Sequence, residues 1–115
     1  MTFYSARLLF VVLVDDGRPR KTHTWDEVVV TFRARDFDHA FARALEIGRS
    51  HETEYLNSDH RKVRWAFVRV ENLDHVGKRL DGAEVASRLA RRRSKTAIPF
   101  GTQFRPEDST PAQSF

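Results

Sequence analysis

Five histidines are the side chains in this sequence that could most readily bind a metal. The segment His51-Glu52-Thr53-Glu54 lacks the second histidine, four positions on, that the helical zinc motif requires. The other histidines are scattered along the chain: His23, His39, His60 and His75. Because zinc ligands recur at close, regular spacings, we predict surface or capping roles for these histidines. We therefore expect no bound metal and no cofactor.

Two pairs of aspartates could suggest a cation site. Asp15 and Asp16 precede a glycine, and Asp36 and Asp38 precede an apolar periodic segment. Neither pair has the ligand spacing of a calcium-binding loop. Turn formation explains the first pair and helix capping explains the second. The absence of cysteine from the sequence also excludes disulfides and thiolate metal sites.

One polar cluster is the best candidate for a small pocket. Its members are Glu52, Glu54, Tyr55 and Arg64, with Trp65 as a possible wall. The first interpretation is an ion-pair network that anchors a helix end, and the alternative is a recognition pocket. Paired catalytic carboxylates need a deep cleft, which a chain of 115 residues rarely forms. We therefore predict that the protein is not an enzyme.

A short basic run is the candidate contact for phosphate groups. It comprises Arg91, Arg92, Arg93 and Lys95. The net charge of the chain is +4, and residues 91–115 hold five basic and two acidic groups. Binding of this kind would depend steeply on salt, because each neutralised phosphate releases counterions. No aromatic residue interrupts the run, which weakens the case for single-stranded nucleic acid.

The elements that must position these residues follow from hydrophobic periodicity. Apolar residues recur at helical spacing over Asp36–Tyr55, whereas alternation over residues 2–14, 23–34 and 62–73 predicts strands. A weaker fourth strand is predicted over residues 83–90. These elements predict an α+β fold, in which a mostly antiparallel sheet of about four strands carries one long helix on one face.

The sheet face opposite the helix is the candidate interaction surface. Its expected members are Leu9, Val11, Leu13, Val29, Trp65 and Phe67. Large exposed apolar patches mark interaction sites. The later apolar segment Ile98–Phe104 could cover this face, either in the same chain or from a second copy. A symmetric homodimer is therefore expected, since it is the commonest assembly for a small domain.

Composition divides the chain into residues 1–90, a single domain, and residues 91–115, a basic and then low-complexity tail. The N-terminal residues lack a basic segment and a small-residue cleavage site, so no signal peptide is expected. No apolar run is long enough to span a membrane. We therefore expect a cytoplasmic protein without membrane contact.

Four segments of the sequence together resemble a bacterial family known only as a domain of unknown function, numbered forty-two eighty-eight. They are Tyr4-Ser5-Ala6-Arg7-Leu8-Leu9-Phe10, Glu52-Thr53-Glu54-Tyr55, Lys62-Val63-Arg64-Trp65 and Asp81-Gly82-Ala83-Glu84-Val85-Ala86-Ser87-Arg88. The resemblance covers roughly residues 3–90 and excludes the tail. It supports the strand–strand–helix–strand–strand order and carries no activity.

These observations favour a non-enzymatic binding or assembly module that associates with itself or with a protein partner. One alternative is association with nucleic acid through Arg91, Arg92, Arg93 and Lys95. A second alternative is a small immunity or regulatory protein that blocks a cognate partner.

Overall fold

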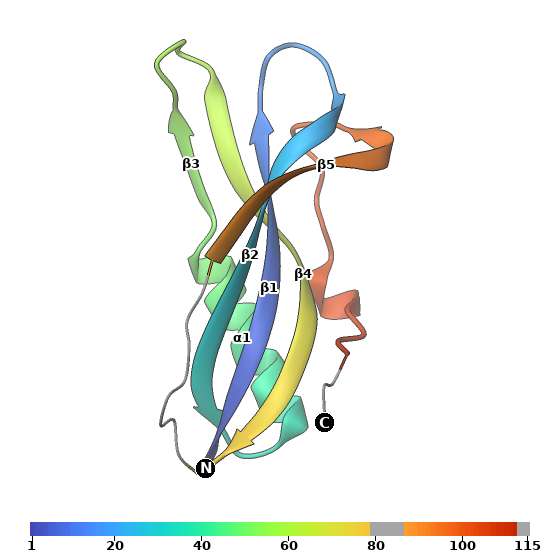
Figure 1. Ribbon diagram of the computed structural model, residues 1–115. Helices are drawn as coiled ribbons and strands as arrows, with labels where there is room; N and C mark the ends of the chain where they lie inside the picture. The colour runs from blue at the N-terminus through green and yellow to red at the C-terminus, as the bar shows by residue number, and fades with distance from the viewer. Residues whose placement is uncertain (79–86, 113–115) are drawn as a thin grey trace.

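The computed structural model describes residues 1–78 and 87–112, leaving aside the side chains of residues 87–89. Among these residues, five strands form one antiparallel sheet and one α-helix packs against it (Figure 1). The elements are β1 (Thr2–Val14), β2 (Arg20–Ala34), α1 (Phe37–Ser50), β3 (Thr53–Leu56), β4 (Lys62–Gly77), β5 (Ser87–Ile98) and the 3₁₀ turn η1 (Pro106–Asp108). The strand order across the sheet is β3-β4-β1-β2-β5. The predicted α+β class is confirmed.

The main core lies between α1 and the side of the sheet that we call the helix face. Alternate residues of β1 point to this face and are buried: Tyr4, Ala6, Leu8 and Phe10. The helix contributes its small residues Ala40, Ala44 and Gly48, all buried. Small side chains let the helix axis approach the strands closely, so the large side chains of the sheet fill the space between the two layers.

The start of α1 agrees with the boundary predicted from the sequence, but its end does not. Asp36 is the N-cap, and its carboxylate accepts a hydrogen bond of 2.8 Å from the His39 backbone N–H. The predicted helix over Asp36–Tyr55 is wrong beyond Ser50, because residues 53–56 form β3. Thr53 pairs with Trp65 and Tyr55 pairs with Val63, so hydrogen bonding to β4 outweighs the helical pattern of this segment.

The strand β4 does not alternate regularly, and this changes which residues share a face. Its register against β1 shifts at three places, including one between Leu9 and Phe10. Each shift inserts an extra residue into β4, as in a β-bulge. As a result Phe67, Val70 and Leu73 all join the core under the helix although they are three residues apart.

The opposite side of the sheet, which we call the far face, carries a second and smaller core. Its buried residues are Val11, Leu13 and Ala66, and Ile98, Phe100 and Phe104 pack against them. The last two belong to residues 99–112, which we call the strap. Figure 1 shows the strap leaving the end of β5 and running down beside β4. The far face is therefore covered in part by the same chain.

The strand β5 lies later in the sequence than the fourth strand predicted over residues 83–90. Residues 83–86 are outside the described part of the chain, whereas β5 continues to Ile98. The basic run is therefore part of the sheet, and the expected division at residue 90 falls inside a strand. Charged side chains are tolerated here because β5 lies at the edge of the sheet. Within the described residues, no helix is long and apolar enough to cross a membrane.

Candidate binding site

The polar cluster expected around Glu52 does not form one pocket. The Glu52 carboxylate accepts a hydrogen bond of 3.2 Å from the Phe67 backbone N–H, and Glu54 lies 3.8 Å from the Lys62 ammonium group. The Trp65 indole Nε1–H donates a hydrogen bond of 3.3 Å to the Tyr55 phenol oxygen. These contacts join β3 and the helix end to β4, so each carries a structural role.

Arg64 is paired with Glu54 across the β3–β4 ladder, but its guanidinium group holds the strap. Its Nη1 donates hydrogen bonds of 2.9 Å to the backbone carbonyls of Phe100 and Thr102. Arg64 is paired with Leu13 across the β1–β4 ladder, which places it on the far face. The guanidinium group therefore closes the strap over the second core, and a recognition pocket around Glu52, Glu54, Tyr55 and Arg64 is not assembled.

The candidate interaction face is divided between the two sides of the sheet. Leu9, Val11 and Leu13 alternate with the helix-face residues of β1 and are buried. Trp65 and Phe67 are paired with Val12 and Phe10, which places them on the helix face. Their predicted position beside Leu9, Val11 and Leu13 is wrong, because both sides of β4 are apolar and its faces could not be assigned from alternation. Val29 is half-buried and is paired with Arg7.

The basic run lies on β5 and is distributed over both faces. Arg91 is paired with Thr24 and Arg93 with Thr22, so these two arginines share one side of the strand. Arg92 is paired with His23 on the other side, where its guanidinium group forms an ion pair with Glu27. Arg91, Arg92, Arg93 and Lys95 are all exposed. The four candidate phosphate contacts therefore do not form one continuous patch.

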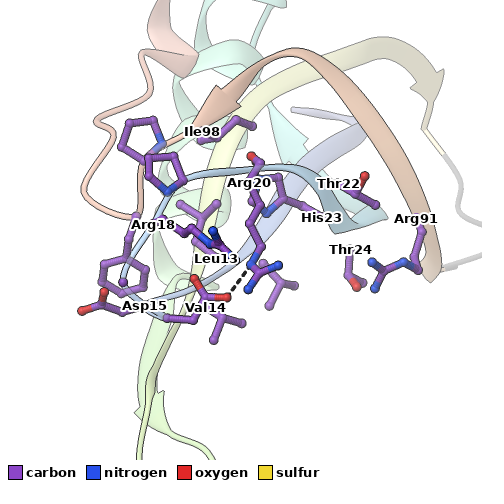
Figure 2. A pocket seen from close by; sticks show the side chains of 16 residues that line it. Leu13, Val14, Asp15, Arg18, Arg20, Thr22, His23, Thr24, Arg91 and Ile98 are labelled. Carbon is purple, nitrogen blue, oxygen red and sulfur yellow. Dashed lines mark hydrogen bonds and ion pairs between the residues drawn. The ribbon is translucent and has the colours of Figure 1, made fainter.

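A pocket of about 490 Å³ lies where the β1–β2 loop meets β5 and the start of the strap (Figure 2). Its lining combines guanidinium groups, hydroxyl groups and an apolar wall. The cationic residues are Arg18, Arg20 and Arg91, and the hydroxyl groups come from Thr22 and Thr24. Figure 2 shows the Arg91 side chain extending towards Thr24.

Two carboxylates at the pocket limit its positive charge. Asp16 forms an ion pair with Arg20, drawn as a dashed line in Figure 2, and Asp15 also lines the pocket. The hydrogen bond from Arg20 is the main reason that the pKa of Asp16 lies below its ordinary value of 3.8, and partial desolvation opposes this effect. Among the described residues, Arg18 and Arg91 have no carboxylate within ion-pair distance. These two guanidinium groups are available to an anion.

The histidines have separate local roles. His23 is buried beside the pocket, and its Nε2 lies 2.7 Å from the Arg20 carbonyl oxygen. His39 accepts a hydrogen bond from the Arg35 backbone N–H, His51 stacks on Phe10, and His75 contacts Tyr4. Across residues 1–78 and 87–112, no three histidine or acidic side chains gather in a way that could hold a metal ion.

Sequence reasoning missed the contribution of the β1–β2 loop to a site. The loop carries Arg18, and Arg20 and Lys21 follow at the start of β2, close in sequence to Asp15 and Asp16. In the sequence, Asp15 and Asp16 indicate a turn, and the basic residues beside them give no distinct signal of a site. The available signal was a second basic segment in the same chain, but the pairing of β2 with β5 that brings Arg20 and Arg91 to one pocket is not visible in either segment.

Comparison with known proteins gives a family and no activity. No curated protein and no solved structure matches the chain. A family model described as a domain of unknown function does match, over residues 3–87. That span contains β1, β2, α1, β3 and β4 and ends at the start of β5, so it leaves out the basic run and the strap. The chain belongs to the family DUF4288.

Proposed function

We propose that the protein is a non-enzymatic binding module that holds an anionic partner at the basic end of its sheet. The observation that carries this proposal is the pocket of about 490 Å³, at which the guanidinium groups of Arg18 and Arg91 have no carboxylate partner among the described residues. Guanidinium groups bind carboxylate and phosphate oxygens through paired hydrogen bonds. The hydroxyl groups of Thr22 and Thr24 beside them add neutral donors for the same oxygens.

Self-association has less support than an anionic partner. The homodimer hypothesis depended on an open apolar surface on the far face. Phe100 and Phe104 pack on this surface from the same chain, and Arg64 fixes their segment by two hydrogen bonds. The far face therefore offers a second copy less apolar surface than the sequence suggested.

The test compares two double variants that remove the same charge from different places. Arg18→Gln with Arg91→Gln alters the pocket, whereas Arg35→Gln with Arg61→Gln alters exposed arginines elsewhere. Fluorescence anisotropy would measure binding of labelled oligothymidylate and of a labelled poly-glutamate peptide over a salt series. Loss of two charge-assisted contacts predicts a weakening of about tenfold or more for the pocket variant.

The dissociation constant of the control variant for each probe should lie within about twofold of the wild-type value. This variant loses only the weak, salt-screened attraction between two exposed arginines and the probe. Equal losses in both variants would mean that net charge alone drives binding, and the pocket proposal would fail. Absence of binding to both probes at low salt would also reject it. An affinity that falls steeply with salt for the oligonucleotide alone would identify nucleic acid as the anionic partner.

A further inference from the structure

The outer edge of β5 is the one long sheet edge that the described part of the chain leaves uncovered. On its inner side β5 pairs with β2 without interruption from Ser87, opposite Val28, to Arg93, opposite Thr22. No described strand pairs with its outer side, since β5 is last in the sheet order. An edge strand presents unpaired backbone N–H and C=O groups and can accept another strand.

The opposite side of the sheet ends in the short strand β3, and beyond β3 the chain itself closes the edge of β4. The β4 backbone N–H groups beyond β3 find acceptors outside the sheet. Phe67 donates to the Glu52 carboxylate at 3.2 Å, Val70 to the Ser109 Oγ at 3.0 Å, and Leu73 to the Ala112 carbonyl at 3.1 Å. An incoming strand would have to displace these groups, and β3 offers only four residues, so β5 is the long accessible edge among the described strands.

The charges on β5 determine which strand this edge can accept. Arg91 and Arg93 extend to one face, and Arg92 extends to the other. Pairing with a second copy of β5 would bring arginines against arginines, and like charges on neighbouring strands are destabilising. The same arrangement favours an acidic strand, whose alternating carboxylates can meet Arg91 and Arg93 across the ladder, whereas Arg92 is already paired with Glu27.

We infer that the anionic partner is an acidic protein segment that binds in extended conformation and adds as a sixth strand to the outer edge of β5. This inference depends on the proposed anion-binding function and names its partner. A peptide strand suits the edge better than a nucleic acid does, because its backbone N–H and C=O groups can pair with those of β5 while carboxylates on one of its faces reach Arg91 and Arg93. A phosphate backbone could reach the same two arginines, but it cannot continue the alternating donors and acceptors of the ladder.

The binding test uses the full-length protein and three labelled probes. The first is a short peptide of alternating Glu and Thr, the second is the same peptide with methylated backbone nitrogens, and the third is oligothymidylate of equal charge. N-methylation preserves the carboxylates and removes the backbone donors that strand pairing needs. We expect the unmodified peptide to bind about tenfold or more tightly than its methylated form. We also expect it to slow amide hydrogen exchange in β5 at Ala90–Arg93.

A charge reversal tests the role of the arginines. The double variant Arg91→Glu with Arg93→Glu should no longer bind the acidic peptide and should bind a peptide of alternating Lys and Thr. The control variant Arg35→Glu with Arg61→Glu should still prefer the acidic peptide, as the wild type does. Thermal unfolding would confirm that each variant is folded, and the milder Arg91→Gln with Arg93→Gln would replace a variant that is not.

The outcomes separate the two proposals. Equal binding of the methylated and unmodified peptides, or a preference for oligothymidylate, would overturn strand addition and leave anion binding in place. Unchanged exchange in β5 on peptide binding would overturn it as well. Absence of binding to all three probes at low salt would reject both proposals.

Discussion

Gly48 of α1 lies directly against the ring of Phe67 in β4. A β-carbon built on Gly48 would lie well inside 3.0 Å of three ring atoms of Phe67, closer than real β-carbons approach other atoms. The glycine is in the body of the helix and is buried. Its place there is explained by the close approach of helix and sheet, because glycine otherwise destabilises a helix relative to alanine by about 1 kcal/mol.

Gly48→Ala should therefore destabilise the protein even though alanine is the better helix former. Crowding against the Phe67 ring should cost more than the helix gains, with a net loss of about 1–3 kcal/mol in the free energy of unfolding. Urea denaturation would measure the loss. Phe67→Leu should recover part of it in the Gly48→Ala background. Gly101→Ala is the matched control, since its new β-carbon would meet nothing within 4 Å. Equal stability of the two alanine variants would contradict this account.

Ser109→Ala should loosen the edge of β4. The Val70 backbone N–H donates to the Ser109 Oγ at 3.0 Å, so the variant leaves this donor without its acceptor. A lost hydrogen bond of this kind costs about 1 kcal/mol. Hydrogen exchange at the Val70 amide should become faster. Thr110→Ala alters the exposed neighbouring residue and should leave this amide unchanged. Unaltered exchange in Ser109→Ala would show that water replaces the serine at no cost.

The start of α1 was predictable from the sequence and its end was not, for one physical reason. The Asp36 cap acts within three residues, on the His39 N–H, so the signal lies within the local sequence. The end at Ser50 depends on Thr53 and Tyr55 pairing with β4, which lies later in the chain. The helical periodicity of apolar residues continues through Tyr55, and no residue nearby in the sequence signals a helix end. Residues 53–56 form a strand because they pair with β4.

The faces of β1 and β2 followed from alternation, whereas those of β4 did not. Phe32 and Ala34 fit the regular alternation of the strand predicted over residues 23–34 and are buried under the helix. In β4 the register shifts place Phe67 and Val70 on the same face, although odd and even positions should oppose each other. A bulge leaves no distinct signal in a strand that is apolar on both sides.

The candidate site was predicted least well, because its parts come from distant segments. The basic run was recognised, but Arg18 of the β1–β2 loop joins Arg91 only through the pairing of β2 with β5. The predicted cluster around Glu52 failed for the opposite reason. Its members are close in sequence, yet Glu54 and Arg64 project from the strands to one side and Tyr55 to the other.

Arg20→Gln should raise the pKa of the Asp16 carboxyl group towards its ordinary value of 3.8. The hydrogen bond from Arg20 is the main cause of the lowered pKa, and glutamine cannot supply its charge. A pKa that is lower in the folded state stabilises the fold above the ordinary pKa. This stabilisation is lost as the pH falls through the lowered value. Carboxyl chemical shifts in an NMR titration would give both pKa values. Arg18→Gln, which keeps its backbone contact to Asp16, should change the pKa little; an equal shift there would contradict the assignment.

Removal of the strap's aromatic side chains tests whether the chain's own residues keep the far face from associating. Phe100→Ala with Phe104→Ala should uncover Val11, Leu13 and Ala66. Each half-buried phenylalanine should contribute about 1–2 kcal/mol to the free energy of unfolding. The uncovered surface should also bind a hydrophobic dye and increase the mass measured by light scattering, because exposed apolar patches promote association. Phe37→Ala is the control, since Phe37 is exposed at the start of α1. A wild-type protein that is already dimeric, and a double variant that is monomeric, would show instead that the strap mediates assembly.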